Sequence, residues 1–324
     1  TKGCSVIPNA WQRLPDIPPQ STEDDERLRF VANSKRSDEL SNAGFAFGYL
    51  AGLIGLVLAI PLILFFTHTQ SSLERKASTL GYQFAMFGVG VWWLSFYVCY
   101  PLTRLKTRPG PPLPEGARTS LSGSLSRLSR TYQSLRDYPQ VARYLVLWFL
   151  MSDGLSSIGS VATLFANAEV DWGCGSKSTG LLLLTMIAAV SSGLGSFFAT
   201  RLQNSLSLST KKMLMLSLCV GLTCPIWGIF GFFLPHIGLK QGWELLLVSI
   251  PFGFTNGTMQ GFSRTLFGLM LPPGKEAAFF SLYQITDKGS SFLGPLVLAA
   301  ISQSSGSMRG GFFYAVMMLS IPLV

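Results

Sequence analysis

Polar and charged side chains interrupt the apolar stretch at residues 254–295, and a carboxylate interrupts another apolar stretch, LVLWFLMSDGLSSIGSV. An ionisable group at the depth of a bilayer costs roughly 2.5 to 3.5 kcal/mol on insertion scales, so such groups persist mainly where they are used or paired. We therefore predict a pathway for a polar solute or ion that is formed by Asp153, Asn256, Gln260, Tyr283, Asp287 and Lys288.

Helical spacing groups several of these residues on shared faces. Asn256, Gln260 and Arg264 stand four residues apart, and so do Tyr283 and Asp287. Because residues at i and i+4 lie on one face of an α-helix, each set is expected to point in one direction.

A solute with one carboxylate and one ammonium group would be complemented by a cation and an acid. Arg264 or Lys288 would bind the carboxylate, and Asp153 or Asp287 would bind the ammonium group. Asp287 and Lys288 are adjacent and so point about 100° apart on a helix, and we expect each to serve a different partner. Protonation of one aspartate would couple transport to protons.

A candidate cytosolic gate comprises Arg201, Arg264 and Glu276. Two of these have simpler interpretations, since Arg264 could reach the lipid headgroups and Glu276 could cap the start of its helix. His68 and His236 have no second ligand nearby in the sequence, so we predict no metal site. We also find no catalytic motif or cofactor-binding motif, and we predict that the protein is not an enzyme.

The elements that must position these residues are apolar helices. The chain has 324 residues, of which 48% are hydrophobic and 13% are charged, and that charged fraction is about half of the usual value for a soluble domain. Crossing a bilayer takes about 20 apolar residues. We predict an all-α membrane protein with spans at residues 45–66, 80–102, 141–166, 180–199, 213–234, 243–271, 277–301 and 311–324.

A basic connection separates the second and third spans. Residues 103–140 carry Arg104, Lys106, Arg108, Arg118, Arg127, Arg130 and Arg136, which indicates a cytosolic location by the positive-inside rule. Within it, Leu121, Leu125, Leu128, Tyr132 and Leu135 recur at helical spacing and predict an amphipathic helix on the membrane surface. Such flanking residues account for much of the net charge of +9, so we predict no nucleic-acid partner.

The segment SRTLFGLMLPPGKEAAFFSLYQITDKGSSFLGP resembles the signature of the autophagy-related protein 22 family, vacuolar amino-acid effluxers within the major facilitator superfamily. GFAFGYLAG, GVGVWWLSF and FLMSDGLSSIG are similar to further family segments in the same order. The superfamily's cytosolic motif of a glycine, an acid and bases is similar to Gly195, Arg201, Lys211 and Lys212, without the acid.

This resemblance implies a major facilitator-like bundle of twelve helices in two halves, of which this chain is a fragment with eight. Residues 1–42 would be a cytosolic polar loop or tail, and residues 43–102 the last two helices of the N-terminal half-bundle. Residues 103–140 would be the cytosolic central connection, and residues 141–324 the C-terminal six-helix half-bundle with a truncated last helix.

The resemblance also implies a function: export of amino acids from the vacuole lumen to the cytosol during autophagic recycling. The expected partners are amino acids or similar zwitterionic solutes, protons as a candidate coupling ion, and the lipid bilayer of the vacuole. The alternative is a non-transporting membrane scaffold or autophagy adaptor that uses its tail and central connection for docking. An intramembrane enzyme is a distant third reading, which rests on Ser157 near Asp153.

Overall fold

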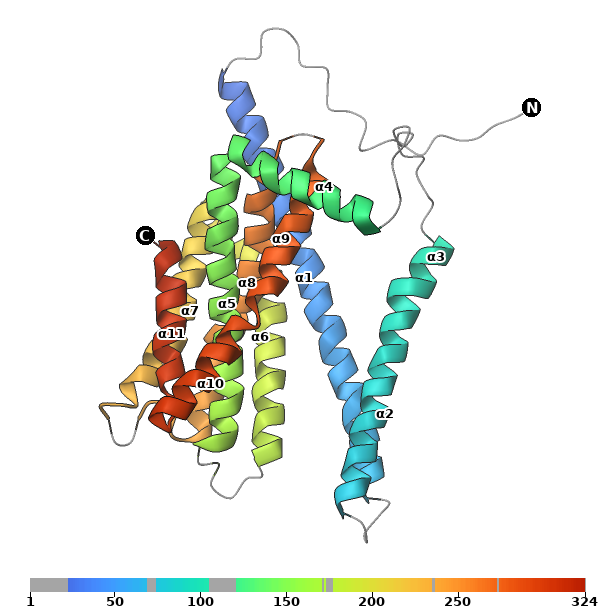
Figure 1. Cartoon of the computed structure of the whole chain (residues 1–324), viewed down its shortest axis with the longest axis vertical. Coiled ribbons are helices and arrows are strands. Elements are labelled where there is room, and N and C mark those ends of the chain that lie inside the picture. Colours follow the sequence, from blue (N-terminus) through green and yellow to red (C-terminus); the bar gives the residue numbers. More distant parts are fainter. Residues whose placement is uncertain are drawn as a thin grey trace, which may run out of the picture.

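The chain folds into a bundle of helices with a long helical arm beside it (Figure 1). The computed structural model describes residues 23–68, 74–104, 121–170, 172, 177–234, 237–272 and 274–323. Residues 1–22 of the predicted tail and 105–120 of the predicted central connection lie outside this range. In the described residues every predicted span is helical, which confirms the all-α prediction.

The bundle consists of α5 to α11. The arm consists of α1 to α3, in which α2 and α3 run antiparallel to α1. The bundle elements are α5 (Pro139–Ala168), α6 (Lys177–Ser205), α7 (Thr210–Phe230), α8 (Gly242–Leu269), α9 (Glu276–Ser290), α10 (Leu293–Ser305), α11 (Gly310–Ser320) and η3 (Ile321–Leu323). The arm consists of α1 (Glu23–His68), α2 (Glu74–Leu94), the π-helical η1 (Ser95–Cys99) and α3 (Tyr100–Arg104). The predicted amphipathic helix is α4 (Leu121–Ser134), followed by η2 (Leu135–Asp137), and it crosses one end of the bundle (Figure 1).

Many large apolar side chains remain exposed on the bundle and the arm, as lipid-facing helices require. Phe47, Met86, Phe87, Leu102 and Val146 are among them. By length and composition alone, four described segments could each cross a membrane: Phe30–Pro61, Pro139–Ala168, Thr179–Ser205 and Thr210–Phe230. The other predicted spans are helices that are shorter, interrupted or more polar.

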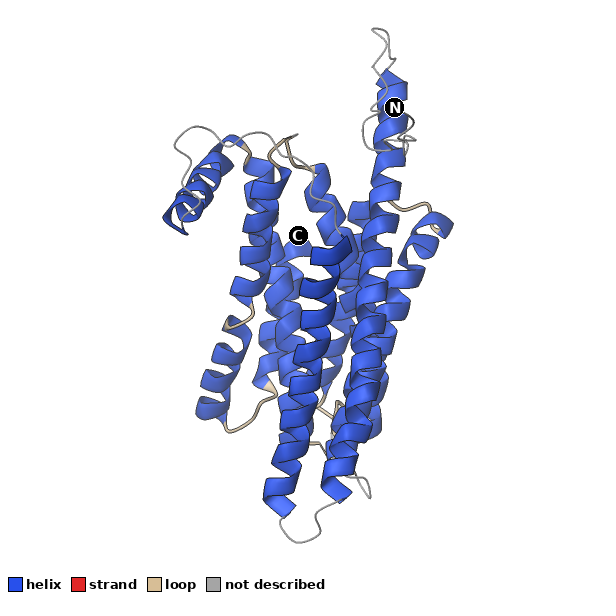
Figure 2. Ribbon diagram, turned by 90° about the vertical axis from the view of Figure 1, so that its right-hand side faces the viewer, coloured by secondary structure: helices blue, strands red, loops and turns tan. Residues whose placement is uncertain are grey.

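The beginning of α1 differs from the sequence-based expectation. We expected a polar loop or tail at residues 1–42, but residues 23–42 are the first turns of α1. The polar side chains of this segment are satisfied by the bundle: Ser41 Oγ donates to the Gly261 carbonyl of α8 (3.0 Å), and Asp38 accepts two hydrogen bonds from α6 and α7. Tertiary contacts therefore stabilise a helix where composition suggested none. Figure 2 shows how far this helix extends beyond the bundle.

Glycines allow α6 and α8 to approach backbone to backbone. On α8, Gly253 and Gly257 lie four residues apart, and a Cβ atom on either would be 2.4 Å from the Ala188 carbonyl oxygen or 2.1 Å from the Ser192 carbonyl oxygen of α6. This spacing of small residues is the usual device for close helix packing in membranes. The close packing fixes the register of α8 against α6.

The single span predicted at residues 277–301 is two helices. It breaks at Ser291 and Phe292, between α9 and α10. Pro295 explains the break, because its nitrogen carries no hydrogen for the Ser291 carbonyl and its ring would clash with that carbonyl in a continuous helix. The N–H group of Gly294 instead donates to the Asp153 carboxylate of α5 (3.1 Å).

The connection between α7 and α8 is folded around a buried carboxylate that sequence inspection missed. Glu244, 2% exposed in the first turn of α8, accepts through Oε2 from the backbone N–H groups of Gly238 and Leu239, both at 2.8 Å, and from Trp227 Nε1 at 3.2 Å. Gly238 has φ +100°, and an added Cβ would be 2.1 Å from the Gly231 nitrogen, so glycine is required there.

We expect Glu244→Ala to lower the stability of the protein by roughly 3 kcal/mol, because it leaves buried N–H donors without an acceptor. The measurement is the thermal unfolding midpoint of the purified protein in detergent. Asp137→Ala, which removes an exposed carboxylate from η2, is the control and should leave the midpoint unchanged. Equal midpoints for the two variants would contradict the assigned role of Glu244.

Candidate functional site

A cavity with a mixed polar and apolar lining opens between α5 and α8 and reaches the first turn of α10. Its volume is about 650 Å³, within the range of roughly 300 to 1,000 Å³ that is usual for small-molecule sites. Hydroxyl and amide groups alternate with apolar residues in its lining, which consists of Ser152, Leu155, Ser156, Gly159, Ser160, Thr163, Leu164, Phe252, Asn256, Gln260 and Pro295. Two of the predicted pathway residues, Asn256 and Gln260, therefore line one cavity.

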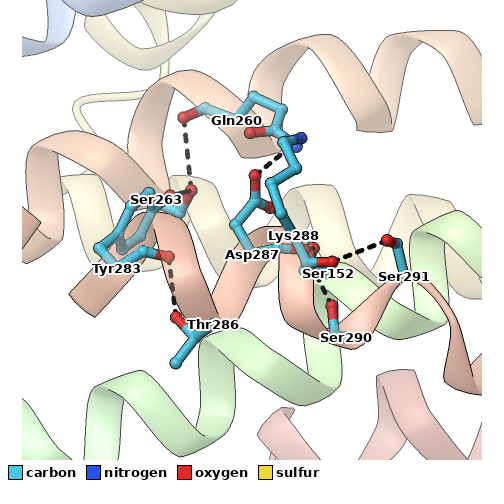
Figure 3. Close-up of polar contacts among 9 residues, drawn as sticks. All are labelled: Ser152, Gln260, Ser263, Tyr283, Thr286, Asp287, Lys288, Ser290 and Ser291. Atoms are coloured by element: carbon cyan, nitrogen blue, oxygen red, sulfur yellow. Dashed lines mark hydrogen bonds and ion pairs between the residues drawn. The ribbon is translucent and has the colours of Figure 1, made fainter. Parts of the chain in front are cut away.

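Asp287 and Lys288 lie next to this cavity through Ser152. Ser152 Oγ, which lines the cavity, donates to Asp287 Oδ1 (2.7 Å). Asp287 Oδ2 forms an ion pair with Lys288 Nζ at 3.0 Å, and the side chains are 7% and 78% exposed. Figure 3 shows the two side chains together, on the side of α9 where Gln260 of α8 lies. The pair thus joins a buried acid to an accessible cation.

The expectation that Asp287 and Lys288 serve different partners was wrong for this state of the protein, because they bind each other. The Cα–Cβ bonds of adjacent helical residues point about 100° apart. The flexible four-carbon stem of a lysine can nevertheless bring its ammonium group back over the preceding residue.

Tyr283 lies inside the aromatic core of the bundle. Its ring stacks on Trp148 and on Phe267, each with ring centroids 5.0 Å apart, and its hydroxyl group lies 3.0 Å from Ser263 Oγ. Tyr144 of α5 donates to the Ser263 carbonyl (2.8 Å). This arrangement holds α9 against α5 and α8, one helical turn before Asp287.

Asp153 is fully buried and points away from Asp287, toward α10 and α11. Its Oδ1 accepts from the Gly294 N–H group (3.1 Å) and its Oδ2 accepts from the Tyr314 hydroxyl group (2.5 Å). Asp153 is not among the residues that line the cavity. The structure therefore places the two predicted aspartates in separate environments, and only Asp287 lies beside the cavity.

The candidate gate residues are exposed and lie near the end of the bundle that carries α4. Arg264 lies over the Phe280 ring, 5.7 Å from its centroid, and Arg201 lies 5.1 Å from the Phe197 centroid. Glu276 accepts from the Gly274 N–H group (2.9 Å), and hydrogen bonds from backbone N–H groups, its own and that of Gly274, lower the pKa of its carboxyl group. Within the described structure, none of these side chains pairs with another of the three.

Sequence reasoning missed most of the hydroxyl groups of the cavity. Ser152, Ser156 and Ser160 recur every four residues on α5, and Thr163 follows on the same face. That spacing was a usable signal. The described residues contain no cluster of three or more His, Cys, Asp or Glu side chains with the geometry of a metal site.

The arrangement of the helices is that of the major facilitator fold, which solved structures share. A fucose:proton symporter of E. coli aligns with a TM-score of 0.59 and 16% sequence identity, over 90% of this chain and 68% of that chain. A structure titled as a Major Facilitator Superfamily transporter, FucP, in the outward conformation, gives 0.58 and 16%, over 88% and 66% of the two chains. At this identity the likeness concerns the fold.

The chain belongs to the family described as Vacuole effluxer Atg22 like, whose sequence model matches residues 5–324. It is 34% identical over 303 residues to Autophagy-related protein 22-1 of Aspergillus clavatus, covering 89% of this chain and 48% of that protein. It is 33% identical over 322 residues to Autophagy-related protein 22 of Yarrowia lipolytica, covering 94% and 52%. The chain thus spans about half the length of these relatives, and the family resemblance noted in the sequence is confirmed.

Proposed function

We propose that this chain forms part of a secondary transporter that moves amino acids from the vacuole lumen to the cytosol. The observation that carries the proposal is the cavity of about 650 Å³ between α5 and α8, with the Asp287–Lys288 pair at its edge. Family membership supports the vacuolar location and the direction of transport. The relatives' length and the major facilitator fold support a site shared with further helices.

The chemistry of the cavity favours a zwitterion over a sugar or an ion of one sign. Hydroxyl and amide groups can bind the polar groups of many solutes, but an adjacent acid and cation complement a carboxylate and an ammonium group together. Lys288 is accessible and would bind the carboxylate. Asp287, held by Ser152, would bind the ammonium group.

The test is flux through proteoliposomes that contain the full-length protein. We expect a labelled amino acid to be transported, and its methyl ester and its deaminated analogue each to be transported at least tenfold more slowly, since each lacks one charge. Transport of a neutral sugar at the rate of the amino acid would contradict the proposed substrate class.

Lys288→Met tests the carboxylate site directly. We expect it to raise KM for the zwitterion about tenfold, because one charge-assisted hydrogen bond of about 1.5 kcal/mol is lost, and to leave the weak flux of the methyl ester unchanged. Lys211→Met, at the start of α7, removes an exposed lysine that does not line the cavity and should transport normally. An unchanged KM in the Lys288 variant would exclude this role.

A non-transporting adaptor remains the second candidate, and α4 is the feature that favours it. α4 packs on the bundle through Leu128 and exposes Leu125 and Tyr132 beside Arg127 and Arg130. For an adaptor, replacing the exposed face of α4 would abolish function in cells, and substitutions in the cavity would not. The opposite outcome supports the transporter.

A further inference from the structure

Asp38 of α1, remote from the cavity, has an incomplete set of hydrogen bonds. It is fully buried. Its Oδ2 accepts from Gln203 Nε2 of α6 (2.8 Å) and from Thr210 Oγ1 of α7 (2.7 Å), whereas Oδ1 has no partner among the described residues. A buried polar atom without a partner costs roughly 1 to 3 kcal/mol, so this oxygen requires a physical explanation.

Asn42 presents the same deficit one helical turn further along. It is 1% exposed, and its Nδ2 donates to the Asp38 carbonyl (2.9 Å), which orients the amide group back toward Asp38. Its Oδ1 has no described partner either and packs on Gly261 of α8, where an added Cβ would be 2.1 Å away. Two acceptor atoms on one face of α1, Asp38 Oδ1 and Asn42 Oδ1, therefore have no donor among the described residues.

No cation compensates Asp38. The charge that acts on it within α1 is Glu39, which repels the carboxylate, while α6, α7 and α8 offer it only the uncharged groups of Gln203, Thr210 and Thr265. Lys35 and Lys211 line a pocket together with Gln203 and Thr210, but neither forms an ion pair with Asp38. The other described cations on these elements do not pair with Asp38 either; they are Arg36, Lys177, Arg201, Lys212 and Arg264.

We propose that Asp38 is a proton-binding site that closes the contact between α1 and the α5–α11 bundle. With a proton on Oδ1, the carboxyl group supplies the donor that Asn42 Oδ1 lacks. Oδ2 remains the acceptor for Gln203 and Thr210. Loss of the proton places an uncompensated charge in a buried contact, which destabilises that contact by several kcal/mol.

The position of Asp38 makes this contact a gate. Among the described side chains of α1, only Asp38 and Asn42 are buried, and further along the helix Tyr49 lies against Gly193 of α6. This is the end of the bundle where α6 joins α7, the predicted cytosolic end. The inference goes beyond the proposed function, since it requires no particular substrate.

The sign of the pH dependence follows from this arrangement. The closed contact binds the proton more tightly than the open one, so the closed fraction falls as pH rises. The contact is therefore closed while Asp38 holds its proton, and release of that proton to the neutral cytosol opens it.

The test is the distance between spin labels placed at Arg36 of α1 and Lys212 of α7, both exposed, in the full-length protein with its other cysteines replaced. We expect a short distance at about pH 5 and a longer one at about pH 8. Asp38→Asn, a permanently neutral side chain, should give the short distance at both pH values. Glu39→Gln removes the neighbouring exposed carboxylate and should keep the pH dependence.

A second variant tests the site while Asp38 is present. Gln203→Leu removes one donor that stabilises the carboxylate, so the midpoint of the pH-driven change should rise by roughly one unit. Three results would each overturn the proposal: an unchanged midpoint in Gln203→Leu, a pH-independent distance in the wild type, or a change driven by sodium instead of pH. Because distance is measured and not flux, failure here is distinct from failure of the proposed transport.

Discussion

Asp287→Asn is expected to reduce amino-acid flux by roughly 100-fold while the protein stays folded. Asparagine keeps the oxygen that accepts from Ser152 Oγ, and Lys288, which is 78% exposed, can be solvated when its ion pair is lost. What disappears is the negative charge beside the cavity that would bind the ammonium group. The measurement is the initial rate of flux in proteoliposomes, normalised to the folded protein determined by gel filtration.

Asp153→Asn is the informative comparison, because it changes the other buried aspartate in the same way. Gly294 and Tyr314 donate to different oxygens of Asp153, so the amide must lose one of these bonds, and we expect a lower thermal midpoint. Wild-type flux in Asp287→Asn would remove its role in binding. Lost flux in Asp153→Asn with an unchanged midpoint would show that Asp153 does more than hold α10.

Gly257→Ala is expected to prevent stable folding of the bundle. The added Cβ would be 2.1 Å from the Ser192 carbonyl oxygen and 2.8 Å from Ser196 Oγ, and neither a backbone carbonyl nor the helix that carries it can move aside locally. Overpacking typically costs about 1 to 3 kcal/mol and more where backbone must shift. The measurement is the yield of monodisperse protein and its thermal midpoint.

Gly289→Ala provides the matched control for Gly257→Ala. An added Cβ at Gly289 of α9 would meet no atom within 4 Å, so the same substitution should be neutral or slightly stabilising, since alanine favours the helix over glycine by about 1 kcal/mol. Equal losses in both variants would mean that helix propensity, and not the close contact between α6 and α8, determines the outcome.

The helices were predictable because long apolar runs are the strongest signal in a sequence, and their polar interruptions marked Asn256, Gln260, Asp287 and Lys288. The break between α9 and α10 was not recognised, although Pro295 lies three residues after Phe292. The helical start of α1 could not be read from composition at all, since it depends on hydrogen bonds to α6, α7 and α8 that are distant in the chain.

The partners of each ionisable group were the least predictable part of the candidate site. Sequence spacing relates residues within one helix, whereas Ser152 meets Asp287, Tyr314 meets Asp153, and Gln203 meets Asp38 across different helices. The interruptions of the apolar stretches therefore identified Asp153 and Asp287, but they could not distinguish an acid beside a cavity from one that holds two helices together.

The break after Ser290 divides the predicted span at residues 277–301 into two separate helices, α9 and α10. α10 is about 20 Å long and is fastened to α5 and α11 through Asp153, whereas α9 is held against α5 and α8 by separate contacts of Tyr283 and Asp287. The break therefore lets the contacts of α9 and those of α10 form independently of one another.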